Sequence, residues 1–151
     1  MPATELTQQN EFFWPVRVYY EDTDSGGVVY YVNYLKFMER ARTELLRDIG
    51  FEQDLLQQEL GLLFAVRSAS IEYKKPARYN DELHVLTSIS SLRKASIIFK
   101  QSVFLSSSEQ SPLLLAEAEI KIACLHAENF SPCGIPKTII EKITQEYFCG
   151  S

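Results

Sequence analysis

Residues 16–50 read VRVYYEDTDSGGVVYYVNYLKFMERARTELLRDIG, and this stretch decides the fold. Its valines and tyrosines predict a strand, and the acidic, glycine-containing segment EDTDSGG predicts a turn. The apolar residues that follow recur at helical spacing and are Leu35, Met38, Ala41, Leu45, Leu46 and Ile49. We therefore expect a helix over residues 34–49, with Asn33 as its N-cap and Gly50 at the left-handed position that ends it.

The rest of the chain predicts mainly strands. Residues 12–20 are the first expected strand, and residues 55–61 add a short helical turn. Four strand-like runs without an intervening helix pattern then cover residues 63–73, 82–91, 94–105 and 113–126. Pro136 starts a terminal helix. This order predicts an α+β domain in which a largely antiparallel sheet packs on the central helix.

Length and composition indicate one globular domain. The chain has 151 residues, of which 46% are hydrophobic and 23% are charged, so it can bury a sizeable core. We expect residues 1–151 to form a single domain, with residues 1–11 as a flexible N-terminal segment. The net charge of −5 argues against a nucleic-acid-binding protein, whose affinity comes from clustered cations.

The N-terminal residues and the cysteines indicate a cytoplasmic protein. Residues 1–14 lack the basic and apolar regions of a signal peptide, and no apolar run approaches the roughly 20 residues that cross a bilayer. Cys124, Cys133 and Cys149 are odd in number and widely spaced, which fits reduced thiols. The spacing of Cys124, His126 and Cys133 matches no zinc pattern, so we expect no metal.

The acidic turn holds the residues best suited to catalysis. Asp22 and Asp24 precede two glycines and the start of a helix, where exposed backbone N–H groups favour negative charge. An anion beside oriented N–H donors is suited to attack or polarise a carbonyl group. The alternative is an ordinary turn, because Asp, Ser and Gly are good turn residues.

Other site chemistries fit the sequence less well. A calcium loop that began at Asp22 would need Glu at its twelfth position, where this chain has Asn33. Phosphate-binding glycine motifs and the G-x-S-x-G elbow are missing from the sequence. His84 and His126 both lie in strand-like runs, so a carboxylate is the best remaining nucleophile or base.

The segment DTDSGGVVYYVNYLKFMERAR closely resembles the signature of the 4-hydroxybenzoyl-CoA thioesterase branch of the hotdog-fold family. It is most similar to the Tol-Pal-associated subgroup, often called YbgC. IEYKKPARYNDEL at residues 71–83 and LRKAS at residues 92–96 follow in the expected order, so the resemblance covers nearly the whole chain. It implies a hotdog fold, in which an antiparallel sheet wraps around one long central helix. It also implies dimers with a continuous sheet, commonly paired into tetramers, with active sites at the subunit interface.

The activity that the resemblance implies is hydrolysis of acyl-CoA thioesters without a metal or organic cofactor. It assigns catalysis to the second aspartate of the turn, Asp24, as nucleophile or general base. It assigns polarisation of the carbonyl to a backbone N–H at the start of the helix, at Tyr31. The subgroup usually has His there; the N–H survives the change, whereas any role of an imidazole does not. Gly27 and Val28 are expected to contact the substrate.

Two basic stretches are candidates for binding CoA. The resemblance favours Arg93 and Lys94, with Ser96 adding a hydroxyl, because Arg offers a planar fork suited to phosphate. The alternative is an ordinary solvated pair at the start of a strand. The second stretch, which we rank lower, consists of Lys74, Lys75 and Arg78.

Glu39 on the central helix is a reserve catalytic carboxylate, since another hotdog branch uses one from this helix. We favour a structural role for Glu39, paired with a nearby Arg or with strand backbone. The leading hypothesis is a cytoplasmic thioesterase for short-chain or aromatic acyl-CoA. The alternatives are a thioesterase for acyl groups on acyl-carrier protein, and a non-catalytic protein that binds CoA or Tol-Pal partners near the inner membrane.

Overall fold

The computed structural model describes residues 10–106 and 112–148. Most of the expected N-terminal segment (residues 1–9), most of the polar connection before residue 112, and Cys149 lie outside the described residues. The described elements are β1 (Phe12–Arg17), the 3-10 helix η2 (Tyr20–Asp22), α1 (Asn33–Asp48), α2 (Gln53–Leu60), β2 (Leu62–Tyr73), β3 (Glu82–Leu92), β4 (Ser96–Leu105), β5 (Leu113–His126) and α3 (Lys137–Glu146).

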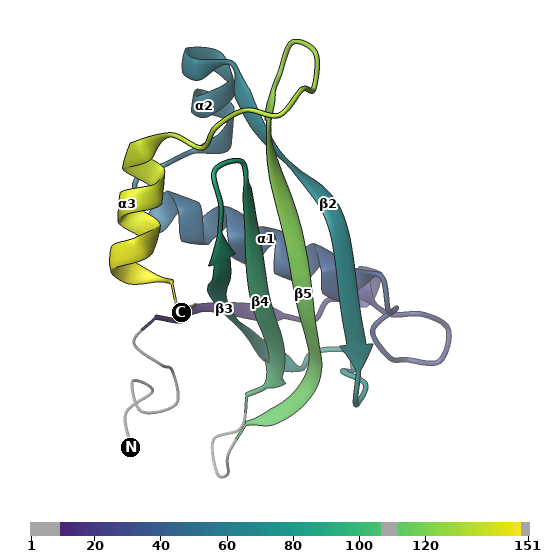
Figure 1. The fold of residues 1–151 in the computed structure, drawn as a ribbon. Helices are drawn as coiled ribbons and strands as arrows, with labels where there is room; N and C mark the ends of the chain where they lie inside the picture. The colour runs from purple at the N-terminus through teal and green to yellow at the C-terminus, as the bar shows by residue number, and fades with distance from the viewer. Residues whose placement is uncertain (1–9, 107–111, 149–151) are drawn as a thin grey trace.

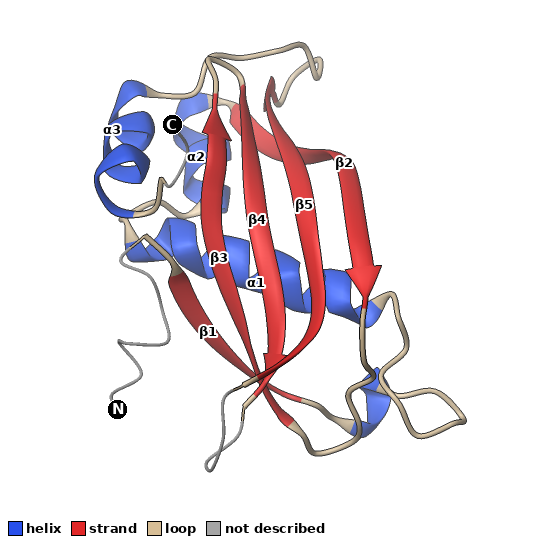
Figure 2. Cartoon of the chain, turned by 60° about the horizontal axis from the view of Figure 1, so that its bottom comes forward, coloured by secondary structure: helices blue, strands red, loops and turns tan. Residues whose placement is uncertain are grey.

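The five strands form one antiparallel sheet in the order β1-β3-β4-β5-β2. Figures 1 and 2 show α1 crossing one face of this curved sheet, with α2 and α3 near one end. The predicted α+β class and the antiparallel sheet around one central helix are therefore confirmed. None of the helices in the described part of the chain is long and apolar enough to cross a membrane.

The core forms where α1 meets the sheet. Four side chains of the helix, Phe37, Met38, Ala41 and Leu45, are 0% exposed. They belong to the same cluster as the inward-facing apolar residues of the strands. Burial of this helical stripe ties its position to the sheet, because apolar area removed from water contributes about 25 cal/mol per Å².

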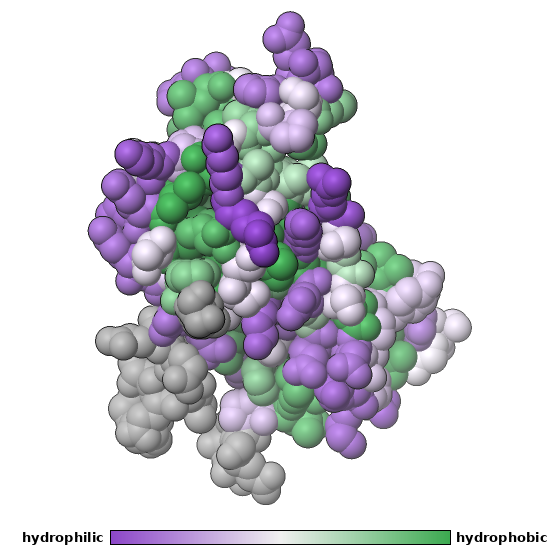
Figure 3. Space-filling model, in the orientation of Figure 1, coloured by the Kyte–Doolittle hydropathy of each residue, from purple (hydrophilic) through white to green (hydrophobic). Residues whose placement is uncertain are grey.

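The opposite face of the sheet is mixed in character. On β5, Ala118 and Ile120 are buried while Glu119 between them is exposed, as the alternating sequence predicts. Figure 3 views the molecule from this side and shows hydrophilic residues interspersed with apolar patches.

The end of α1 is as predicted, but its start is not. Gly50 has φ +97, its N–H donates to the Arg47 carbonyl, and the Phe51 N–H donates to the Leu46 carbonyl. These two bonds form a Schellman cap, which favours glycine at this position. Asn33 was expected to be the N-cap, but it is the first residue of the helix and its side chain does not cap it. Instead, its Nδ2 donates to the Asp22 carbonyl at 2.8 Å.

Two predicted strands differ from the structure by more than one residue at one end. β1 ends at Arg17 because the chain turns into η2, where Asp22 Oδ2 accepts the Tyr19 N–H at 2.9 Å. β4 begins at Ser96 because the residues before it form the turn from β3, closed by the Arg93 N–H donating to the Ser96 carbonyl at 2.9 Å. Arg93 and Lys94 therefore lie in a hairpin turn and not in a strand.

Candidate active site

Asp24 lies at the base of a tight hairpin turn between η2 and α1. Its N–H donates to the Val28 carbonyl at 2.9 Å, and its carbonyl accepts the Gly27 N–H at 3.0 Å. Gly27 has φ +81, a conformation that side-chain-bearing residues rarely adopt. Oδ1 of Asp24 accepts the Gly26 N–H at 2.8 Å, and nothing else in the described residues donates to this exposed carboxylate. The turn thus holds one carboxylate oxygen and leaves the other accessible.

Asp22 has a different part in the structure. Its carboxylate caps η2, and its carbonyl accepts hydrogen bonds from the Tyr30 N–H at 2.9 Å and from Asn33 Nδ2 at 2.8 Å. These bonds join the base of the acidic turn to the start of α1. Asp22 therefore organises the backbone between the turn and α1, whereas Asp24 is exposed.

The backbone at the start of α1 offers N–H donors. Within the described residues, no acceptor lies within hydrogen-bonding distance of the Tyr31 N–H or the Val32 N–H. N–H groups at a helix start lack partners within the helix, and the helix dipole makes them attractive to negative charge. The Tyr31 carbonyl accepts the Tyr73 hydroxyl at 3.1 Å, which anchors this backbone to the end of β2.

Tyrosine side chains surround these donors. The rings of Tyr30 and Tyr31 are 4.9 Å apart, and Tyr73 meets Tyr31 edge-on at 6.0 Å. The pKa of Tyr30 is raised, chiefly by its hydrogen bond with the Tyr31 side chain and also by the negative charge of Asp24. The tertiary structure therefore brings Asp24 and the Tyr30–Tyr31 pair together.

The second basic stretch lies beside this turn. Val28 pairs with Arg78 in an isolated antiparallel bridge, and the Val29 N–H donates to the Ala77 carbonyl at 2.8 Å. Lys74 and Lys75 help to line a hollow of about 230 Å³ next to Tyr31. This stretch is ranked below Arg93 and Lys94 in the sequence analysis because the family resemblance favours those two residues, and the local sequence does not reveal that residues 77–78 pair with residues 28–29.

The first basic stretch lies at the other end of the sheet. Ser96 pairs with Ala123, which pairs with Ala65 of β2, whereas Tyr31 contacts Tyr73, eight residues further along that strand. At 3.3 Å per residue, this separation is about 26 Å. Within one chain, the structure does not bring Arg93, Lys94 and Ser96 together with Asp24.

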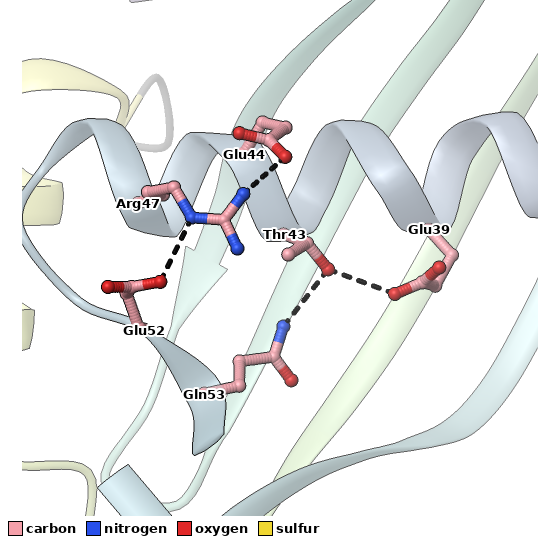
Figure 4. A network of polar contacts seen from close by, with 6 residues as sticks. All are labelled: Glu39, Thr43, Glu44, Arg47, Glu52 and Gln53. Atoms are coloured by element: carbon pink, nitrogen blue, oxygen red, sulfur yellow. Dashed lines mark hydrogen bonds and ion pairs between the residues drawn. The ribbon is translucent and has the colours of Figure 1, made fainter. Parts of the chain in front are cut away.

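In the part of the chain that the structure describes, Glu39 forms neither of the two expected contacts, with an arginine or with strand backbone. Its Oε2 accepts the Thr43 hydroxyl at 2.9 Å, and Thr43 in turn accepts Gln53 Nε2 at 3.2 Å from α2. Figure 4 shows this chain of contacts beside the separate ion pairs of Arg47 with Glu44 and Glu52. Glu39 is exposed, and it lines two hollows between α1 and β2.

Sequence reasoning missed Arg42, which also lines both hollows and is buried. A signal was present in the sequence. Arg42 falls four residues after Met38 and three before Leu45, so it lies on the apolar stripe of the helix.

Comparison with known proteins identifies the family. The Thioesterase-like superfamily matches residues 18–143. Acyl-CoA thioester hydrolase YbgC of Escherichia coli O6:H1 is 44% identical over 134 residues, which cover 89% of this chain and 96% of that protein. Acyl-CoA thioesterase YbgC of Haemophilus influenzae is 43% identical over 130 residues, covering 86% of this chain and 92% of that protein.

A solved structure shows the same fold. A mutant 4-hydroxybenzoyl CoA thioesterase complexed with 4-hydroxybenzoyl CoA superposes with a TM-score of 0.83, covering 89% of this chain and 99% of that one. Its sequence is 20% identical, so this likeness concerns the fold alone. The solved structure supports the hotdog fold, and the match over residues 18–143 together with the YbgC relatives shows that this chain belongs to the Thioesterase-like superfamily and is a thioesterase.

Proposed function

We propose that this protein hydrolyses acyl-CoA thioesters, with short-chain or aromatic acyl groups, at the site formed by Asp24 and the start of α1. The observation that carries the proposal is the Tyr31 N–H, which donates no hydrogen bond within the described residues and belongs to the helix start that Asp22 joins to the turn with the exposed Asp24 carboxylate. The names of the YbgC relatives support acyl-CoA as the substrate.

The reaction needs an anion on one side of the carbonyl and a donor on its oxygen. Donation from the Tyr31 N–H stabilises the negative charge that develops on the thioester oxygen. Asp24 then either attacks the carbonyl carbon, expelling the CoA thiolate and leaving a mixed anhydride for water to hydrolyse, or takes a proton from an attacking water. Gly27 and Val28, which lie between these two groups in the chain, are proposed to contact the substrate.

Replacing Asp24 tests whether its negative charge is needed for the reaction. Asp24→Asn keeps the shape of the side chain and an oxygen for the Gly26 N–H, but it removes the charge. We expect kcat/KM for a short-chain acyl-CoA to fall by about 10²–10⁴. Asp22→Asn is the matched control, because its amide oxygen can still accept the Tyr19 N–H, and its activity should stay within a few-fold of the parent. Parental turnover by Asp24→Asn would remove this residue from the mechanism.

Replacing Tyr31 separates its backbone from its ring. Tyr31→Pro deletes the N–H just before the first helical turn, where proline is well tolerated. Loss of one oxyanion donor predicts a fall in kcat of about 10²–10³. Tyr31→Ala keeps the N–H but loses the ring, as Tyr31→Pro does, and should remain within a few-fold of the parent. Equal rates for the two folded variants, checked by circular dichroism, would show that the N–H is not used.

We also propose that two chains pair along β2. This twelve-residue strand is an edge of the sheet, and Val66 on it is 56% exposed. Long exposed edges tend to pair with another strand. A two-fold antiparallel pairing of β2 strands would bring the Arg93 turn of one chain toward the Asp24 end of the other, which supports an interfacial active site.

Ala69 provides the test of this pairing. The Lys74 N–H faces β5, and N–H groups alternate in direction along a strand, so the Ala69 N–H faces away from β5. Ala69→Pro should therefore leave the β2–β5 ladder intact and weaken the dimer. Light scattering should give a dimer mass for the parent and for the control Ala69→Ser, and a lower mass for Ala69→Pro. A monomeric parent would contradict the proposal.

Arg93, Lys94 and Ser96 are proposed to bind the phosphates of CoA across this interface. The double variant Arg93→Ala/Lys94→Ala should raise KM for acyl-CoA about tenfold with little change in kcat. It should have no effect on the same acyl group carried by pantetheine, which lacks the nucleotide. Lys75→Ala/Arg78→Ala is the comparison variant; if it alone raises KM, the phosphate contacts belong to the second basic stretch.

A further inference from the structure

Two adjoining hollows run between α1 and β2. The larger, of about 280 Å³, begins near the helix start with Val32 and Leu35 in its wall. The smaller, of about 100 Å³, continues toward α2 and is lined by apolar side chains such as Phe64 and Phe99. Glu39, Arg42 and Val66 line both hollows.

Arg42 is the unusual member of this wall. It is 8% exposed, and its Nη1 donates to Gln101 Oε1 at 2.9 Å. Gln101 is itself fixed, because its Nε2 donates to the Met38 carbonyl and to Thr87 Oγ1, both at 2.9 Å. No other acceptor, and no carboxylate within 4.0 Å, meets the guanidinium in the described residues.

A buried cation with one hydrogen bond is poorly compensated. A guanidinium carries five N–H donors, and burying a charge without partners is costly. Burial lowers the pKa of Arg42, and the nearby charge of Glu39 raises it in part. In the described residues, every side-chain nitrogen or oxygen atom that is sealed from solvent has a hydrogen-bond partner. The guanidinium N–H groups of Arg42 that have no partner are therefore not sealed, and they open into the two hollows that Arg42 lines.

We propose that Arg42 is a specificity-determining residue, which donates hydrogen bonds to an oxygen at the far end of the acyl group. The site would therefore favour acyl chains that end in a hydroxyl or carboxylate over plain hydrocarbon chains. This inference rests on the proposed function for the position of the thioester at the helix start, and it extends the acyl group from a short chain to a longer one that lies between α1 and β2.

The geometry suits a chain of moderate length. Val32 and Arg42 line the same hollow although they are ten residues apart, an axial rise of about 15 Å. Long helical side chains lean toward the N-terminus, so the guanidinium lies closer to the helix start than its Cα does. Glu39 is in the same wall and can accept a hydrogen bond from a terminal hydroxyl.

The experiment compares octanoyl-CoA with omega-hydroxyoctanoyl-CoA and suberyl-CoA, with the hexanoyl and decanoyl series covering other lengths. We expect the parent to prefer an oxygenated chain by roughly 10- to 100-fold in kcat/KM at one of these lengths. Arg42→Gln keeps a neutral donor for Gln101 and should reduce this ratio at least several-fold. Arg42→Lys, which keeps the positive charge, should retain part of the preference for oxygenated chains. Arg40→Gln, on the exposed side of the same helix, should leave the ratio unchanged.

The outcomes distinguish this inference from the proposed function. If the parent hydrolyses no acyl-CoA of any kind, the proposed function fails. If it hydrolyses plain and oxygenated chains equally, or if Arg42→Gln lowers both rates by the same factor, the specificity role of Arg42 is overturned and the residue is structural. A change in the ratio cannot come from general damage to the fold, because such damage affects both substrates alike.

Discussion

The site depends on the burial of α1 against the curved sheet. Phe37, Met38, Ala41 and Leu45 are fully buried, so the helix cannot rotate or slide without exposing large apolar surface. The Schellman cap at Gly50 sets where the helix ends, and the backbone just before its start is held beside the end of β2 by the Tyr73 hydroxyl, which donates to the Tyr31 carbonyl. A helix held in this way can present its unpaired N–H groups at a constant place.

Asp22 joins the acidic turn to this fixed helix start through hydrogen bonds. Its carbonyl accepts from both Tyr30 and Asn33, so the turn and the first turn of the helix move as one piece. Asp24 then needs only its own hairpin to be placed near the donors, and the remaining carboxylate oxygen stays accessible. Each of the two aspartate carboxylates accepts one backbone N–H, but the Asp24 side chain is exposed, whereas Asp22 is half-buried and its carbonyl is bonded to the start of α1.

The polar groups between α1 and β2 also divide into groups that are fully paired within the fold and groups that are left open to the hollows. Gln101 and Thr87 are fully buried and pair with each other and with the helix backbone, which makes them part of the framework. Arg42 joins this framework through one hydrogen bond and keeps the rest of its guanidinium for the hollows. Glu39 lies at the surface of the same groove and is held by Thr43 and Gln53. A single strip of wall therefore combines apolar area with a cation and an anion.

The sequence by itself determined the long helix, the bounds of β5, the α+β class and the family. These features rest on local periodicity, on glycine at a left-handed position, and on a long contiguous motif. Local pattern did not predict that Asn33 bonds to Asp22, because that hydrogen bond depends on how the turn folds back.

Only the tertiary structure decided which basic residues share an end of the sheet with Asp24. It also decided that Arg42 faces the hollows between α1 and β2 rather than open solvent. Both are properties of strand register and helix packing, which join residues far apart in the chain.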